Sequence, residues 1–463
     1  MKNFKKKYIG DKAFYIYAMS LALPMIAQNL ITNFVSMLDN IMVGQVGTLE
    51  MSGVSIINQF IFVFNITIFG AVSGAGIFGT QFFGKGDHEG HKFTMRFRLY
   101  LIVMLVVAFM VILKIFETPL IGLFLSDKDD PLVVKETLGY GISYLNVIIW
   151  SFIPFGIGQA YASAIMECGE TKIPMMGSLA AIGINLVLDY GLIFGKLGLP
   201  KLGVAGAAYA TVAAKCVEAF VMIFWAHTHK DKNRYLDGLY KSLHVPGRLA
   251  GEIFIKGCPL IINEFMWSLG MSVIAQSYSV RGIEVVAARN VSSTLTNLFN
   301  VVFVQMGHAL GIVVGMKLGE GDMEGAKDYN NKMLMLSEIL STIIALIMIP
   351  VAFIFPTIYN TEKEVMDLST YFILISAVAM PIWSYTNSAY FTLRSGGKTG
   401  ITFLFDFGFS WLIMIPLAFV LTHFTGMDIH GVFAIVTFSE LLKVVVGYFM
   451  VKSEIWVQNI VNT

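Results

Sequence analysis

Charged residues are scarce in this sequence. They make up 14% of the 463 residues, whereas roughly a quarter of the residues in an ordinary soluble domain are charged. Hydrophobic residues account for 56%, so most of the chain is too apolar to be surrounded by water. This balance excludes a soluble enzyme or a water-soluble binding domain as the main body of the protein.

Other absences narrow the function further. Only three cysteines occur, each in or beside an apolar stretch, so neither a disulfide framework nor a zinc site is expected. A formal net charge of +1 gives no reason to expect nucleic acid as a partner. The sequence contains no GxxxxGK[ST] phosphate loop, so we expect no direct use of ATP and no cofactor. GAGIFG at 74–79 fits the dinucleotide pattern, but it lies in an apolar stretch without a preceding strand and is better interpreted as close helix packing.

Long apolar stretches recur along nearly the whole chain. Many exceed the roughly 20 residues that a helix needs to cross a hydrocarbon core of about 30 Å. The sequence therefore predicts an all-α integral membrane protein with twelve transmembrane helices. Their expected ranges are 14–44, 53–81, 97–116, 139–166, 174–197, 204–228, 252–280, 287–316, 333–356, 366–393, 401–422 and 429–451.

The two halves of the sequence repeat each other. A shift of 235 positions aligns FGKGDHEGHK at 83–92 with LGEGDMEGAK at 318–327, and a shift of about 228 pairs CGET at 168–171 with GGKT at 396–399. Equal halves of the same orientation imply a parallel repeat, in which transporters bind substrate between the halves. The predicted organisation is a six-helix bundle at 1–228, a cytoplasmic linker at 229–250 and a second six-helix bundle at 251–463.

The distribution of basic residues predicts the orientation of the chain. With the N-terminus in the cytoplasm, about 22 of the 32 Lys and Arg fall on the cytoplasmic side and about 8 outside. Both termini are therefore expected in the cytoplasm, with the protein in the inner (plasma) membrane. We expect the first apolar stretch to be an uncleaved span, the lipid bilayer to be the main surroundings and the protein to be a monomer.

Acidic and amide side chains inside the spans are the strongest candidates for function, because a charge in lipid costs several kcal/mol unless it meets water or a partner. Asp39 lies near the outer end of the first span. Asn185 and Asp189 are four residues apart in the fifth and share one helical face. Their oxygens suit a proton or a hard cation such as sodium. Helix-end water at Asp39 and an interhelical hydrogen bond at the other two are the simpler alternatives.

The second half offers candidates for substrate binding. Glu264 follows Pro259 in the seventh span, and Trp267 lies one turn further on. A carboxylate beside an aromatic ring suits an organic cation, although a tryptophan in a membrane helix is more often a packing residue or an interfacial anchor. Asp406 in the eleventh span is a weaker candidate because it lies closer to the cytoplasmic end.

Three further features favour structural or mechanical roles. Lys215 with Glu218 and Glu440 with Lys443 are pairs three residues apart, and we expect each pair to neutralise itself along its own helix. Pro24 removes a backbone hydrogen bond in the middle of the first span. A bend at this proline would move Asp39.

Together these motifs resemble the multidrug and toxic compound extrusion (MATE) family of secondary transporters. The resemblance covers nearly the whole chain, and its combination of motifs is specific although each is weak alone. PLIINEFMWSLG around Glu264 and the RSGGKT turn are most similar to the bacterial DinF-like branch. The motifs of the first half are DNIMVG at 39–44, GKGD at 84–87, CGETKIP at 168–174, NLVLDYGLIFG at 185–195 and GVAGAAYAT at 203–211.

The resemblance implies an antiporter that exports cationic or amphipathic organic molecules in exchange for protons or sodium ions. It further implies a bend of the first helix at Pro24 and a role for Glu264 in the second half. The ion site that it implies in the first half consists of Asp39, Asn185, Asp189, Thr211 and, without a motif to anchor it, Gln159.

The two halves differ at one position of the ion site, and two alternative functions remain open. Ile274 stands where the shift of 235 places the counterpart of Asp39, so the ion site is not expected to be duplicated. A lipid-linked precursor flippase of the same superfamily could share the repeat, although Lys215 is the only mid-span cation expected, whereas flippases often have a strongly basic cavity. A membrane sensor or scaffold would not need acids inside its helices. The residues do not separate proton from sodium, nor do they name the substrate.

Overall fold

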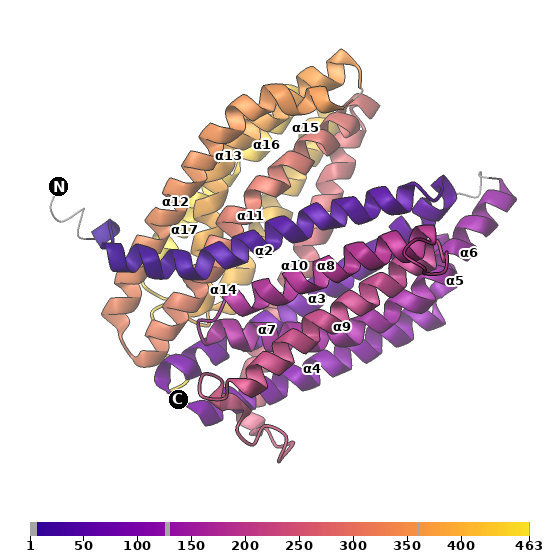
Figure 1. Cartoon of the computed structure of the whole chain (residues 1–463). Coiled ribbons are helices and arrows are strands. Elements are labelled where there is room, and N and C mark those ends of the chain that lie inside the picture. Colours follow the sequence, from indigo (N-terminus) through magenta and orange to yellow (C-terminus); the bar gives the residue numbers. More distant parts are fainter. Residues whose placement is uncertain (1–6, 126–129, 360, 463) are drawn as a thin grey trace. The chain divides into compact units, whose positions relative to one another are not determined.

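The computed structural model describes residues 7–125, 130–359 and 361–462, which are almost entirely helical and contain no strand (Figure 1). Twelve helical segments in this part of the chain are long and apolar enough to cross a membrane. The prediction of an all-α membrane protein with twelve spans is confirmed. The spans of the first half are α2 (Lys12–Gly44), α3 (Thr48–Lys85), α4 (His88–Ile115), α6 (Pro131–Ile148) continuing through η1 (Ile149–Ser151) into α7 (Phe152–Glu167), α8 (Lys172–Phe194) and α9 (Val204–Thr228).

The second half has the same number of spans. The eleventh span of the chain, which lies in this half, is interrupted by two π-helical turns, η4 and η5. Two short helices of the chain, α5 (Glu117–Gly122) and η2 (Arg234–Leu236), lie outside the spans. The spans are α10 (Gly247–Ser279), α11 (Ile283–Glu320), α12 (Met323–Ile354) with η3 (Phe355–Ile358), α13 (Lys363–Ser395), α14 (Thr399–Phe403) with η4 (Leu404–Gly408), η5 (Ser410–Met414) and α15 (Ile415–Phe424), and α16 (Ile429–Phe438) with α17 (Glu440–Lys452).

All twelve predicted ranges coincide with helices, but several helices begin earlier than predicted. The largest differences are at α4, α6 and α12, which begin at His88, Pro131 and Met323. Hydropathy detects only the lipid-crossing part, whereas a helix extends to the residue that caps it. The side chains of Asp130 and Asp322 provide such caps by accepting bonds from the backbone N–H groups of Leu132 and Gly325.

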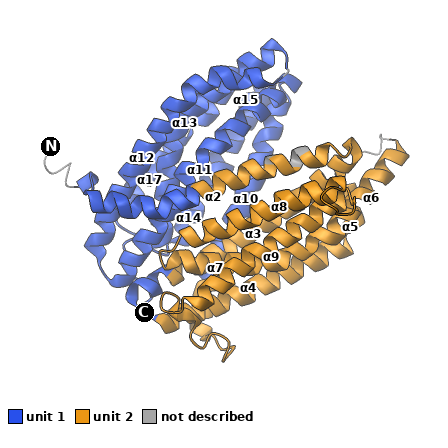
Figure 2. Ribbon diagram, viewed as in Figure 1, with its two compact units in different colours: residues 1–26, 80–87, 255–463 blue, residues 27–79, 88–254 orange. Residues whose placement is uncertain are grey.

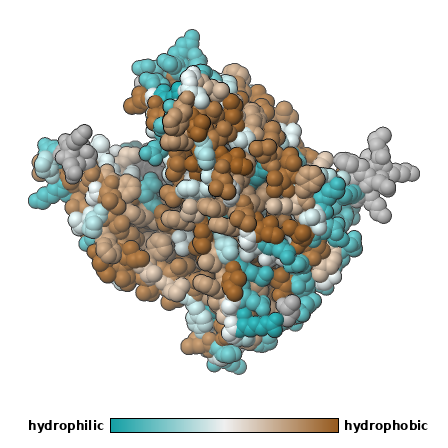
Figure 3. Space-filling view, turned by 180° about the vertical axis from the view of Figure 1, so that it is seen from behind, coloured by the Kyte–Doolittle hydropathy of each residue, from teal (hydrophilic) through white to brown (hydrophobic). Residues whose placement is uncertain are grey.

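The exposed side chains are strongly apolar. Figure 3 shows one face on which hydrophobic residues predominate. Ile283 and Leu412, for example, are 80% and 76% exposed. Large aliphatic side chains exposed along the spans would be unfavourable in water, whereas hydrocarbon tails solvate them. The surface therefore agrees with a protein that crosses the membrane many times.

The chain forms two compact units. One contains residues 1–26, 80–87 and 255–463, and the other contains residues 27–79 and 88–254 (Figure 2). Each has its own hydrophobic core. In the second of these units, Phe64 of α3 stacks on Phe152 of α7 with ring centroids 4.0 Å apart. The predicted bundles at 1–228 and 251–463 follow the sequence repeat and remain a prediction.

The repeat is visible in one helix crossing inside the first of these units. A Cβ atom added at Gly84 of α3 would lie 2.1 Å from the Met316 carbonyl oxygen, and one added at Gly319 of α11 would lie 2.0 Å from the Gln81 carbonyl oxygen. A shift of 235 converts Gly84 into Gly319 and Gln81 into Met316, so the two contacts are reciprocal. A parallel repeat related by a two-fold axis produces such a contact. The absence of a Cβ at both glycines allows the backbones to approach this closely.

The connection between α9 and α10 is packed against α4. The buried Arg96 guanidinium donates to three backbone carbonyls of the connection, at Leu239 (2.8 Å), Gly238 (2.8 Å) and His244 (3.0 Å). Tyr235 is 1% exposed, and burial raises the pKa of its phenol well above the ordinary value, so it stays neutral. This connection lies in the predicted linker range and is an ordered part of its unit.

We expect Arg96→Ala to release this connection. Three carbonyls would lose a charged donor, and each such hydrogen bond contributes about 1.5–3 kcal/mol. Limited proteolysis between His229 and Pro246 should therefore become at least about tenfold faster. Arg248→Ala is the matched control, because the Arg248–Glu252 ion pair is largely exposed. Cleavage of Arg96→Ala at the wild-type rate would contradict this role.

Candidate functional site

Two carboxylates meet inside the unit that contains residues 27–79 and 88–254. Asp39 comes from α2 and Asp189 from α8, and their side chains are near enough to interact. Asn185, one turn before Asp189, also approaches it. Asp189 is 2% exposed and Asn185 is 6% exposed. The structure therefore brings together three of the five residues predicted for the ion site.

These three side chains are incompletely paired. Among the described residues, Asp39 Oδ1, both carboxylate oxygens of Asp189 and Asn185 Nδ2 are buried without a hydrogen-bond partner. Within the same part of the chain no basic side chain forms an ion pair with either aspartate. Two ionised carboxylates only accept hydrogen bonds, so they repel each other unless a proton or a cation lies between them. The arrangement is chemically suited to binding one positive charge.

Tyr144 of α6 belongs to the same cluster and was not predicted. It is 6% exposed and lies near enough to both Asp39 and Asp189 to interact electrostatically. A phenol can donate a hydrogen bond to a carboxylate or contribute an oxygen to a cation. Acids and amides within spans are conspicuous in the sequence because they are costly in lipid, whereas a polar aromatic residue in GYGISYLN carries no comparable signal.

Thr211 and Gln159 occupy different surroundings. The Thr211 hydroxyl donates to the Ala207 carbonyl of its own helix at 3.0 Å. Gln159 of α7 lines a small pocket together with Gln28 and Glu218. Neither residue has a described contact with the carboxylate pair, so their part in ion binding stays a prediction.

The counterpart of the ion site in the other unit is apolar. Ile274, at the position equivalent to Asp39, is 4% exposed within a hydrophobic cluster. Leu417, which a shift of 228 makes equivalent to Asp189, packs against the same cluster. Both equivalent positions are thus packed among apolar side chains, and the prediction of a single ion site stays a prediction.

Glu264 lies among polar groups of α10 and α13. The Tyr390 hydroxyl donates to Glu264 Oε1 at 3.4 Å, and Arg394 is near enough to attract the carboxylate. Trp267, one turn along α10, is 45% exposed. The structure thus gives Glu264 specific partners, while binding of substrate by either residue stays a prediction.

Asp406 is engaged on both oxygens. Lys443 Nζ of α17 is 2.5 Å from Asp406 Oδ1, and Asn263 Nδ2 of α10 donates to Oδ2 at 2.9 Å. The direct ion pair of Lys443 is therefore with the eleventh span and not with Glu440. Glu440 is still near enough to attract the lysine, as predicted, and accepts from Thr386 at 3.4 Å. A role of Asp406 in binding substrate stays a prediction, although neither oxygen is without a partner.

The corresponding prediction for the first half is confirmed. Lys215 Nζ is 2.8 Å from Glu218 Oε2 within α9. Lys215 of the sixth span thus forms its ion pair within its own helix, whereas Lys443 of the twelfth span forms its ion pair with an acid of another helix.

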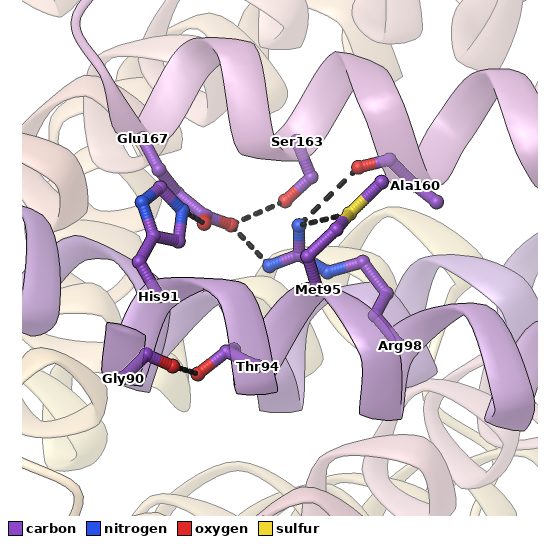
Figure 4. A network of polar contacts seen from close by, with 8 residues as sticks. All are labelled: Gly90, His91, Thr94, Met95, Arg98, Ala160, Ser163 and Glu167. Atoms are coloured by element: carbon purple, nitrogen blue, oxygen red, sulfur yellow. Dashed lines mark hydrogen bonds and ion pairs between the residues drawn. The ribbon is translucent and has the colours of Figure 1, made fainter. Parts of the chain in front are cut away.

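A second buried ionic network lies between α4 and α7 (Figure 4). Arg98 forms an ion pair with Glu167, whose other oxygen is 3.1 Å from His91 Nε2, and Ser163 donates to the carboxylate at 2.8 Å. Arg98, His91 and Glu167 are 0%, 1% and 3% exposed. A Cβ atom added at Gly79 would lie 2.0 Å from Glu167 Oε2, so the GAGIFG segment serves close packing, as predicted.

Comparison with known proteins identifies the family. The family model described as MatE matches residues 24–191 and 259–420, more than half of the chain. The chain belongs to the MatE family. These ranges include Asp39, Asp189 and Glu264, and membership confirms the resemblance found in the sequence. Transporters of this family are not enzymes.

Individual MatE relatives match over most of their length. The probable multidrug resistance protein NorM of Thermotoga maritima is 24% identical over 417 residues, which are 89% of this chain and 86% of the relative. The probable multidrug resistance protein YoeA of Bacillus subtilis is 23% identical over 438 residues, 93% of each chain. A solved outward-facing structure of a multidrug resistance MATE family transporter matches 95% of each chain with a TM-score of 0.85 at 17% identity, which shows a common fold.

Proposed function

We propose that this protein is a secondary antiporter that exports cationic or amphipathic organic compounds in exchange for protons or sodium ions. The observation that carries the proposal is the pair of neighbouring carboxylates, half-buried Asp39 and buried Asp189, with four polar atoms of the site left unpartnered among the described residues. Two relatives are named as probable multidrug resistance proteins, which supports the same proposal. The proposal includes a location in the inner (plasma) membrane with both termini in the cytoplasm, which the excess of Lys and Arg on that side supports.

The carboxylate pair supplies the energy coupling in this proposal. When a proton or Na⁺ is bound, repulsion between the two acids is relieved and α2 can lie close to α8. When the ion leaves, the pair carries excess negative charge in a region of low dielectric, and separation of the helices becomes favourable. An ion drives transport only if it binds the two states differently, and this change at the α2–α8 contact provides the difference. Pro24 allows α2 to bend between the states.

The oxygen-rich site accommodates either coupling ion. Asp39, Asp189 and Asn185 would supply oxygen ligands to Na⁺, with Tyr144 beside them, and a proton needs only one of the carboxylates. The substrate would be held separately, with Glu264 attracting its positive charge and Trp267 contributing an aromatic surface.

The deciding experiment measures efflux of a fluorescent organic cation from proteoliposomes, with a proton gradient and a sodium gradient imposed separately. We expect one of the two gradients to accelerate efflux at least about tenfold over the rate without a gradient, because only the ion that binds the carboxylate pair can shift the two states. Acceleration by neither gradient, with the protein shown to be folded, would refute antiport. Lipid scrambling or flipping by the same preparation would then favour the flippase alternative.

A further inference from the structure

A chain of hydrogen bonds links three helices of the unit that holds the carboxylate pair. Gln28 Nε2 of α2 donates to the Ser178 hydroxyl of α8 at 2.8 Å. Ser178 in turn donates to Glu218 Oε1 of α9 at 2.6 Å, and Lys215 neutralises the other oxygen of Glu218 at 2.8 Å. Ser178 is 5% exposed and Glu218 is 8% exposed. The first helix is thus fixed to the fifth and sixth by a polar chain inside the membrane, which we call the first-half tether.

The other half has a counterpart at equivalent positions. Shifts of 235 and 228 convert Gln28 into Asn263, Ser178 into Asp406 and Lys215 into Lys443. Asn263 donates to Asp406, which pairs with Lys443, so an amide of the first helix again meets the fifth helix and a lysine of the sixth. Both amides lie one turn after a helix proline, Pro24 or Pro259. The tether is therefore a repeated element, although its carboxylate is on the sixth span in the first half (Glu218) and on the eleventh span in the second half (Asp406).

The first-half tether has the same register as the ion site. Gln28 precedes Asp39 by eleven residues on α2, and Ser178 precedes Asp189 by eleven residues on α8. Eleven residues are just over three full helical turns, so both contacts lie on the same faces of the two helices, about 16 Å apart along the axes. Any sliding or rotation of α2 against α8 that breaks the Gln28–Ser178 bond also changes how Asp39 faces Asp189.

The surroundings of the tether allow it to open. Gln28, Gln159 and Glu218 line a pocket of about 40 Å³, which exceeds the space that one water molecule requires. Polar groups released by a movement of α2 could therefore be hydrated, and opening does not leave a carboxylate and an amide buried without partners. Without room for water, opening the tether would leave these polar groups unpaired, and the tether would stay closed.

The second-half tether, formed by Asn263, Asp406 and Lys443, stands beside no such ion site. The equivalents of Asp39 and Asp189 are Ile274 and Leu417, which belong to one apolar cluster. The protein therefore contains two copies of the tether, of which only one shares its helices with a carboxylate pair. This difference separates a role in coupling from a role in stability.

We propose that Gln28, Ser178, Glu218 and Lys215 are positioning residues for ion coupling, which set the α2–α8 register that brings Asp39 opposite Asp189, and that the second-half tether has no part in ion coupling. This inference rests on the proposed function, because it concerns the same ion site. It adds that the ion dependence of transport is determined in part by residues about 16 Å from the ion.

The experiment compares Ser178→Ala with its counterpart in the other half. Ser178→Ala removes both hydrogen bonds of the tether but adds no charge. We expect the ion concentration for half-maximal efflux to shift about fivefold or more, which corresponds to about one hydrogen bond, while the substrate KM changes less than about twofold. Ser178→Thr, which restores a hydroxyl, should return the ion dependence to within about twofold of wild type. Asn263→Ala, which breaks the second-half tether, should leave the ion dependence within about twofold as well.

A second measurement does not depend on transport. Carbodiimide labelling of Asp39 and Asp189 in detergent, followed by mass spectrometry, reports the pH at which the pair becomes reactive. We expect Ser178→Ala to shift this midpoint by about half a unit or more and Asn263→Ala to leave it in place. An unchanged midpoint and ion dependence in Ser178→Ala, or equal shifts in both variants, would overturn the proposal. Wild-type protein that transports with neither gradient would refute the proposed function instead, and the labelling would still decide on the tether.

Discussion

Asp39→Asn and Asp189→Asn are each expected to reduce gradient-driven efflux at least about 100-fold. Either change leaves a single carboxylate beside an amide, so release of the ion no longer creates two facing negative charges. The difference in ion affinity between the two states is then lost, and a ligand without such a difference cannot shift an equilibrium. The measurement is ion-driven uptake or efflux of a fluorescent cation in proteoliposomes of matched protein content.

Binding of substrate without a gradient should survive in both variants. Tryptophan fluorescence or isothermal titration in detergent would test this, because Glu264 and Trp267 are unchanged. Asp367→Asn is the control, since Asp367 is an exposed acid of α13. Wild-type efflux in both site variants would remove the carboxylate pair from the mechanism. A loss of efflux in Asp367→Asn would show that the assay responds to acidic residues in general.

Glu167→Ala is expected to have the largest effect on stability. The change leaves the fully buried Arg98 guanidinium without its carboxylate and removes the contact of His91 with that carboxylate. Removing one member of a buried ion pair typically costs about 3–5 kcal/mol, because the other charge remains desolvated. The free energy of unfolding, or the apparent melting temperature in detergent, should fall accordingly, and the yield of monodisperse protein should fall with it.

Glu117→Ala provides the comparison for this prediction. Glu117 pairs with Lys114, whose side chain is 45% exposed, and such exposed pairs contribute about 0–1 kcal/mol. Removing both charges of the buried Arg98–Glu167 ion pair, as in Glu167→Gln with Arg98→Met, should recover part of the loss because no unpaired charge remains. Equal stabilities of Glu167→Ala and Glu117→Ala would show that the network is not important for folding.

The helices and the repeat were predictable because they depend on local or periodic properties. Crossing a membrane requires about twenty apolar residues, and the sequence contains such a stretch at each of the twelve spans. The turns with Gly86 and Gly321 adopt positive φ angles of +75° and +80°, so their glycines recur at the same shift as the rest of the repeat. Helix starts were less predictable, since capping side chains such as Asp322 lie outside the apolar part.

The candidate site was predictable only in part. Asp39 and Asp189 were conspicuous because acids in lipid are costly, and Asn185 followed from helical spacing. Tyr144 was missed since a tyrosine in a span is unremarkable by composition. The closest partner of Lys443 was missed for a related reason. Spacing favours Glu440 on the same helix, whereas packing brings Asp406 of the eleventh span within 2.5 Å.

The sequence by itself determined the twelve helices, the six-helix repeat, the family and the presence of acids inside the first and fifth spans. Only the tertiary structure decided that Asp39 meets Asp189, that Tyr144 joins them, and that Gln28, Ser178 and Glu218 form a chain on the same helices. Hydrophobic burial and helical periodicity act along one segment and leave a pattern in its residues. Contacts between helices depend on rotation and register, which single-segment patterns do not specify.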